Sequence, residues 1–204
     1  MRPGHPAVIL KAIRHRLPRM ALLGVMGCLW MAVAAAQETG LEIRHASTRL
    51  ENGVWYLAAR IDYRLNRETL DALQNGIPLT FGLQVELSRQ RNWLPDEDVA
   101  ELRQDFQLSW DPLARGYLVR NKNSGDQHSH TTLFAALNDL GRITALPLID
   151  AALVEDGEDY EVALRAALDQ QQLPGPLRML AFWNDNFTLE SDWYRWDLRS
   201  ASGP

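Results

Sequence analysis

The sequence predicts an all-β domain, an antiparallel β-sandwich of immunoglobulin-like architecture with two short helices. Seven or eight short segments alternate large apolar with polar side chains, the period of a strand that has one face in a core and the other in water. Turn-forming residues, among them Asn52-Gly53 and Asp156-Gly157, separate these segments. No alternation of strands with long helical patterns supports a parallel α/β sheet.

The first hairpin is predicted to pair residues 41–50 with residues 54–65. Asn52-Gly53 between them is a strong hairpin signal, because a type I′ turn needs positive φ at both central positions. The second strand places large side chains on one face: Trp55, Leu57, Ala59, Ile61, Tyr63 and Leu65. The opposite face carries charged residues, so we expect this hairpin to be half-solvated.

Asn66 can cap a short helix over residues 67–75, which Gly76 ends. An alternating strand then runs from Pro78 to Leu87. Gly82 within this strand suggests a bulge or a close backbone approach.

The next strand is predicted from about residue 100 to 110, and Pro95 to Asp98 before it reads as a turn or a strand kink. Residues 117–120 form a further strand. A second helix follows Thr131 or Thr132 and ends at Gly141. Its inward stripe is predicted to be Leu133, Phe134, Leu137 and Leu140.

Residues 146–154 are apolar but interrupted by Pro147 and Asp150, so we interpret them as an irregular or edge segment. Residues 160–168 alternate as a strand; helix is the competing assignment, because small helix-forming residues follow one another there. Residues 173–176, Leu-Pro-Gly-Pro, are predicted to interrupt regular secondary structure. The last strand is predicted over residues 187–198, with a switch of side-chain phase near Ser191-Asp192, as a bulge would cause.

Ahead of these elements, residues 20–36 form an uncharged apolar run that follows five basic residues and ends in Ala34-Ala35-Ala36. This layout is typical of a secretory signal peptide over residues 1–36, with Gln37 the new N-terminus of a single domain over residues 37–204. We therefore expect a periplasmic protein. The alternative is an uncleaved anchor that holds the domain on the inner membrane, facing the periplasm, since the run is barely long enough to span a bilayer.

Residues 37–204 hold 16 of the 21 Lys+Arg and all 26 Asp+Glu, so their net charge is −10. An acidic surface argues against nucleic acid as a partner, because phosphates need a basic footprint. It also argues against direct docking on anionic lipid, which leaves the N-terminal segment as the membrane contact if it is uncleaved. Cys28, the only cysteine, lies before the cleavage site, so the mature domain has neither a disulfide nor a thiol nucleophile.

Five separated stretches resemble, in order, the exported proteobacterial family catalogued as domain of unknown function 4390. They are Trp55–Tyr63, Asn75–Phe81, Tyr117–Asn121 with Ser124-Gly125, Leu146–Asp150 and Ser191–Trp196, and the resemblance covers nearly all of residues 41–198. That family has no established activity, so the resemblance implies no catalytic residue. Genes of the family often lie near a nitrogen-regulation-type sensor kinase, so the resemblance implies a membrane sensor kinase as one candidate partner.

Two polar clusters carry side chains that can bind a metal or act on a substrate. His128 and His130 share one face of an extended segment, but a metal site needs a third ligand, and His45 is the only other histidine after residue 36. We expect an exposed polar strand there, and no metal. Asp96, Glu97, Asp98 and Glu101 lack the spacing of a calcium loop, and neighbouring carboxylates seldom flank a substrate bond, so we expect a solvated turn.

The C-terminal aromatics are the binding residues that the sequence favours: Trp193, Tyr194 and Trp196. Exposed Trp and Tyr suit a partner protein or a sugar face, although burial in the core is the commoner fate of such residues. The sequence therefore predicts a non-enzymatic interaction or accessory module, without a cofactor, that binds another envelope protein through an edge strand or an aromatic patch. The alternatives are a glycan or small-ligand binding domain and, third, an envelope hydrolase.

Overall fold

The computed structural model describes residues 40–91, 93–183 and 187–198. The chain divides into two units, residues 1–37 and 38–204, and every described residue lies in the second. The predicted signal peptide, residues 1–36, lies outside the described residues, and its cleavage before Gln37 stays a prediction. Within the described ranges, no helix is both long and apolar enough to cross a membrane.

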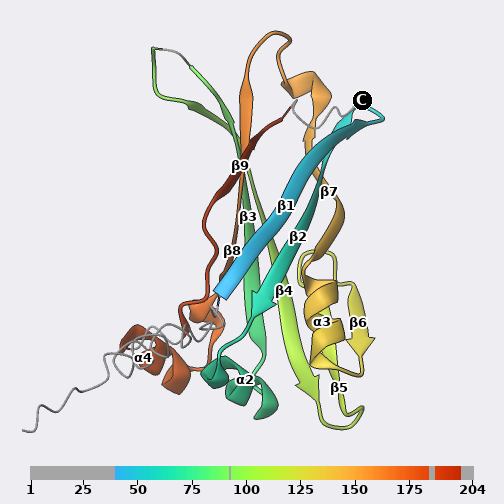
Figure 1. The fold of residues 1–204 in the computed structure, drawn as a ribbon, viewed down its shortest axis with the longest axis vertical. Coiled ribbons are helices and arrows are strands. Elements are labelled where there is room, and N and C mark those ends of the chain that lie inside the picture. The colour runs from blue at the N-terminus through green and yellow to red at the C-terminus, as the bar shows by residue number, and fades with distance from the viewer. Residues whose placement is uncertain (1–39, 92, 184–186, 199–204) are drawn as a thin grey trace, which may run out of the picture. The chain divides into compact units, whose positions relative to one another are not determined.

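The described strands form two antiparallel sheets, which confirms the predicted all-β sandwich (Figure 1). The smaller sheet has the order β1-β2-β7 and consists of β1 (Gly40–Glu51), β2 (Val54–Arg64) and β7 (Arg142–Asp150). The larger sheet has the order β6-β5-β4-β3-β8-β9 and consists of β3 (Leu79–Arg89), β4 (Glu97–Asp111), β5 (Gly116–Asn121), β6 (Gln127–His130), β8 (Tyr160–Leu168) and β9 (Tyr194–Asp197). This division of six and three strands differs from the four and three of an immunoglobulin constant domain.

The core lies between the sheets, where alternate side chains of β2, β3 and β8 are buried. Phe81 of β3 meets Tyr63 of β2 edge to face, with ring centroids 5.0 Å apart, so one aromatic pair joins the two sheets. Burial raises the pKa of the Tyr63 phenol. The strand assignment of residues 160–168 is confirmed over the helical one, and the large apolar side chains of this strand, Tyr160, Val162, Leu164 and Leu168, are buried.

The first hairpin forms as predicted. Asn52 and Gly53 have φ values of 50° and 81°, the positive pair that a type I′ turn requires. β1 and β2 then pair along their whole length, with one register shift after Ile43.

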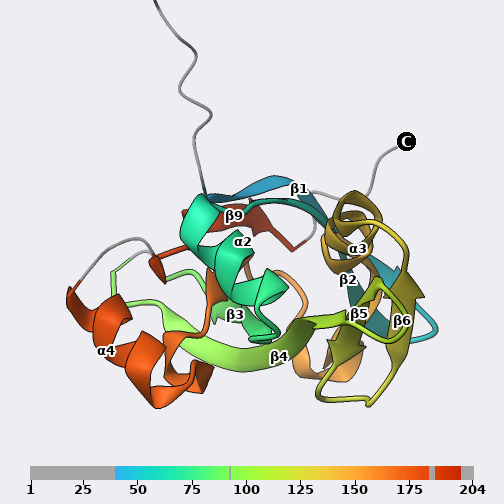
Figure 2. The same cartoon turned by 90° about the horizontal axis from the view of Figure 1, so that it is seen from below.

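Two helices also form where the sequence places them. α2 (Arg67–Gln74) begins at Asn66, whose side chain accepts from the Thr69 backbone N–H. α3 (Leu133–Leu140) begins at Thr132 and contacts β5, β6 and β2, where Figure 2 shows it at the side of the sandwich.

The predicted inward stripe of α3 needs one correction. Phe134 is 79% exposed, whereas Ala136 and Leu140 are buried. At about 100° per residue, Phe134 falls off the face shared by Leu133, Ala136, Leu137 and Leu140.

A third α-helix, α4 (Gly175–Trp183), occupies a region in which the sequence predicted only a chain break and then a strand. Pro176 lies in its first turn, where proline is tolerated because that N–H has no partner within the helix. Two single 3₁₀ turns, η2 (Ala151–Leu153) and η3 (Gln170–Gln172), are also present.

The predicted last strand over residues 187–198 is shortened to β9. Its predicted switch of phase is confirmed. Leu164 of β8 pairs with Tyr194, and Ala167, three residues further along β8, bridges Glu190, which lies four residues before Tyr194. The C-terminal segment therefore has one extra residue between these two pairs, as in a bulge. Phe187 and Leu189 are therefore buried before the switch and Leu198 after it.

Two strands differ in detail from their predictions. Gly82 does not mark a bulge, since β3 and β8 keep an unbroken register; a side chain of β4, that of Arg103, lies over it instead. β4 begins at Glu97, so the last two residues of the predicted turn or kink, Glu97 and Asp98, belong to the strand. The register of β4 with β3 shifts one residue later, at Val99, which lies between the pairs Leu87–Ala100 and Ser88–Asp98.

Candidate functional site

A groove of about 340 Å³ lies on the solvent face of the larger sheet. The hollow arises because Gly82 of β3 pairs with Ala167 of β8, so two neighbouring outward positions carry little or no side chain and the floor of the groove lies close to the backbone. In the next row, Arg103, Gln84 and Arg165 stand side by side on β4, β3 and β8. η3 and Glu190 complete the rim of the groove.

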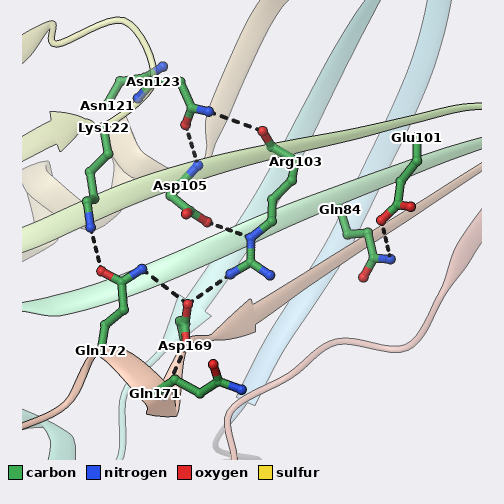
Figure 3. Close-up of polar contacts among 10 residues, drawn as sticks. All are labelled: Gln84, Glu101, Arg103, Asp105, Asn121, Lys122, Asn123, Asp169, Gln171 and Gln172. Carbon is green, nitrogen blue, oxygen red and sulfur yellow. Dashed lines mark hydrogen bonds and ion pairs between the residues drawn. The ribbon is translucent and has the colours of Figure 1, made fainter.

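Arg103 is the centre of a polar network along this groove (Figure 3). Its Nη2 donates to Asp169 Oδ2 at 2.8 Å and its Nε donates to Asp105 Oδ1 at 3.0 Å. The hydrogen bond to Asp105, strengthened by the charges of Asp105 and Asp169, raises the pKa of Arg103. Because Asp169 also accepts from the Gln171 backbone N–H at 3.0 Å, this network ties β4 to the start of η3.

The second arginine of the groove, Arg165, is also paired. Its Nη2 contacts Glu190 Oε2, and its guanidinium lies 5.8 Å from the Trp193 ring centroid. Arginine, carboxylate and amide groups of this kind can bind sugar hydroxyls or a small polar ligand. In this groove, however, the charged groups are bonded to one another, so a ligand would have to replace existing contacts.

The three predicted binding residues do not form one patch. Tyr194 and Trp196 are half-buried, pack against the core and have ring centroids 5.8 Å apart. The Trp196 indole donates to Thr48 Oγ1 at 3.3 Å, across to β1 of the other sheet. Trp193 lies one position out of phase, beside Arg165 and Arg195, whose guanidinium carbons are 5.8 and 5.9 Å from its ring centroid. A role for these residues in binding a ligand stays a prediction.

His128 and His130 share one face of β6, as expected from their spacing, and both meet Asp139 of α3. His128 Nδ1 and His130 Nε2 each lie 3.0 Å from Asp139 Oδ2. His45 belongs to β1 in the other sheet. Among the described residues, no group of three or more His, Cys, Asp or Glu side chains is arranged to hold a metal ion.

Replacing Asp139 with asparagine is expected to weaken the acid dependence of stability. Burial alone would raise the Asp139 pKa, but hydrogen bonds and positive charge from His130 and His128 outweigh it and lower the pKa below 3.8. A carboxyl with a lowered folded pKa stabilises the fold above its unfolded pKa, and this contribution disappears as pH falls through the folded value. Urea unfolding between pH 7 and pH 2 measures this contribution. At neutral pH the free energy of unfolding of the variant should be lower than that of the wild type by less than about 1 kcal/mol, and in strong acid the two should be equal. Identical curves would contradict this.

The acidic segment after Pro95 is held within the fold rather than arranged as a pair of free carboxylates. Glu97 forms ion pairs with Arg89 and Arg91, and the hydrogen bond from Arg89 is the main cause of its lowered pKa. Glu101 accepts from the Gln84 side chain at 3.2 Å. These contacts do not place two carboxyls on opposite sides of a cleft, which is the arrangement that glycoside hydrolysis needs.

A surface that sequence reasoning missed lies at the end of the sandwich where β3 joins β4. Trp93 is 96% exposed and Leu94 is 63% exposed, and Figure 1 shows the β3–β4 hairpin standing clear of the two sheets. The β1–β2 turn and the loop that follows β7 lie at the same end (Figure 1), and they carry Leu50 and Leu153, which are 53% and 64% exposed. A Trp-Leu pair directly before the predicted turn at Pro95, in a connection where large apolar side chains are unusual, was the available signal.

Three contacts join the loops of this surface. Arg89 Nη1 lies 3.0 Å from Glu155 Oε2, and the Gln90 N–H donates to the Asp159 carbonyl at 2.9 Å. The Ala151 N–H donates to the Gly53 carbonyl at 2.8 Å. We call this surface the Trp93 end: residues 50–53, 89–98 without residue 92, and 150–159.

Comparison with known families finds one match: residues 38–197 fit the family described as "Domain of unknown function (DUF4390)". A search of curated proteins gives no match.

Proposed function

The chain belongs to the DUF4390 family of unknown function, and from this premise we propose that it is a non-enzymatic interaction module that binds another protein of the cell envelope. The proposed location is the periplasm, either as a released domain or held at the inner membrane by residues 1–36. A membrane sensor kinase is one candidate partner.

The observation that carries this proposal is the position of the exposed apolar side chains. Of the seven large hydrophobic residues that are exposed in the described part of the chain, four lie at the Trp93 end. Scattered apolar residues need no explanation on a protein surface, but a concentration of them supports a contact with another molecule. Trp is also the residue type most enriched among those that dominate binding energy.

The edges of the sheets support docking by side chains rather than by addition of a strand. β6 and β9, the edges of the larger sheet, have four residues each. β7 carries Pro147, and its pairing with β2 shifts twice. β1 lies against the C-terminal strand, since Thr48 Oγ1 donates to the Leu198 carbonyl at 3.0 Å. Short, kinked or covered edges of this kind resist pairing with another chain.

The polar groups give less support to an enzyme or to a glycan binder. In the described residues, no buried side-chain nitrogen or oxygen lacks a hydrogen-bond partner. The two carboxylates that line the groove, Asp169 and Glu190, are each paired with an arginine, Arg103 and Arg165 respectively, so they do not form an acid and a base with opposed environments. Trp193, which a sugar would need as a stacking platform, has arginines beside it.

Affinity capture of the tagged full chain from envelope extract tests the proposal. After chemical cross-linking in intact cells, we expect a discrete cross-linked species containing one specific protein, and the tagged partner should recover the chain in return. The matched control is an unrelated tagged periplasmic protein expressed at the same level. Recovery of the same proteins by chain and control would refute the proposed function.

A further inference from the structure

We propose that the β3–β4 hairpin is the docking element, and that it inserts Trp93 into an apolar pocket with a cationic rim on the partner protein. This inference rests on the proposed function and adds to it the contact residues and the chemistry of the partner. Three observations carry it: the exposure of the tip, the ordered base of the hairpin, and the local charge.

The tip offers a large apolar contact that the described chain leaves uncovered. A Trp side chain buries about 150–250 Å² when it enters a pocket. Leu94 follows it directly, and both are more than half exposed. A contact of this size matches the central anchor of an interface, whose full extent is usually ~800 Å² per partner. The neighbouring loops of the Trp93 end can supply the remaining area.

The base of the hairpin is held in place by ion pairs and hydrogen bonds. Arg89 pairs with Glu97 across the hairpin and with Glu155 on the loop after η2. Arg91 also pairs with Glu97, and its backbone N–H donates to Asp96 Oδ1 at 3.2 Å. Since its base is already ordered, the hairpin loses little conformational freedom when it binds.

The negative charge around the hairpin tip favours a partner with a positively charged surface. Residues 89–98 and 150–159 contain two arginines against eight acidic residues, a net charge of −6. Both arginines are already paired with carboxylates. The surface that approaches must therefore be cationic, because an acidic one would be repelled during encounter. Anionic lipid and a second copy of this acidic end are disfavoured for the same reason.

Leu113 provides a matched control. It is 96% exposed, as Trp93 is, but lies on the β4–β5 turn at the other end of β4. Replacing either residue with serine removes an exposed apolar side chain without disturbing the core. A difference between the two variants therefore reports the position of the contact rather than the loss of an apolar group.

The test compares binding of the captured partner to full-length wild type, Trp93→Ser, Leu113→Ser and Glu158→Lys. We expect Trp93→Ser to weaken binding ~30-fold or more, the effect of losing a dominant anchor. Leu113→Ser should bind as the wild type does. Glu158→Lys, an exposed charge reversal in the loop that bonds to the hairpin at Gln90, should slow association, and added salt should slow association of the wild type. Thermal unfolding of each variant checks that the fold is retained.

Each other outcome has a defined meaning. If the wild type binds its partner and Trp93→Ser binds equally well, this inference is wrong while the proposed function stands. If the wild type captures no specific protein, both are wrong. Trp93-dependent sedimentation with phosphatidylcholine or phosphatidylglycerol vesicles would identify a lipid surface as the occupant and overturn the inference. Trp93-dependent self-association of the purified full chain would overturn it in favour of a second copy.

Discussion

Replacing Gly141 with alanine is expected to destabilise the fold by about 3 kcal/mol or more, because there is no space for the added carbon. Gly141 ends α3 and accepts a hydrogen bond from the Ile61 backbone N–H at 2.9 Å. A Cβ placed there would lie 2.0 Å from the Ile61 carbonyl oxygen. Since that oxygen belongs to the central strand of the smaller sheet, either α3 or β2 must move.

Gly76 provides the control for this substitution. Its φ is +82°, and a Cβ added there would meet nothing within 4 Å, so alanine should cost only the backbone strain of about 1–2 kcal/mol. Urea unfolding of both variants at neutral pH measures the difference. If Gly141→Ala is no less stable than Gly76→Ala, the close approach of α3 to β2 is not a constraint on the fold.

Replacing Phe81 with alanine is expected to cost about 3–5 kcal/mol, the usual cost of removing a buried aromatic side chain from a core. Phe81 is 1% exposed and lies between the sheets. It also makes the edge-to-face contact with Tyr63, so its loss weakens the attachment of one sheet to the other. Chemical unfolding followed by tryptophan fluorescence measures the change.

Phe134 is the matched control for Phe81, since it is the same residue type but 79% exposed on α3. Its replacement with alanine should change stability by no more than about 0.5 kcal/mol. A double-mutant cycle with Tyr63→Leu should assign about 0.5–1.5 kcal/mol to the ring pair itself. Equal losses for the Phe81 and Phe134 variants would show that the burial of these two residues has been assigned incorrectly.

Much of the fold could be predicted because its signals are local. A strand with one buried face must alternate, and a type I′ turn must accept positive φ, so β2, β3, β8 and the Asn52-Gly53 turn were readable from the residues alone. Helix caps are equally local, as Asn66 and Thr132 illustrate. α4 was missed because Gly175 and Pro176 at its start are typical of a loop that interrupts secondary structure, although a helix tolerates proline in its first turn.

The candidate site could be predicted less well, because exposure of a large side chain depends on what the rest of the chain covers. Tyr194, Trp196 and Trp93 look alike as apolar aromatics in the sequence. Tyr194 and Trp196 pack against the core of the sandwich, whereas Trp93 lies on a hairpin tip that no described element reaches. The groove also has no signal of its own, because Arg103 and Asp169 are 66 residues apart and meet only through the sheet.

The sequence by itself determined most of the strands, the first turn, two helix starts and the acidic character of the domain, since each follows from neighbouring residues or from composition. Only the tertiary structure decided how nine described strands divide between two sheets, why position 141 has no space for a side chain, and where apolar groups remain exposed. The physical reason is the same in each case. Packing, close approach and solvent exposure are set by contacts between segments that are distant in the chain.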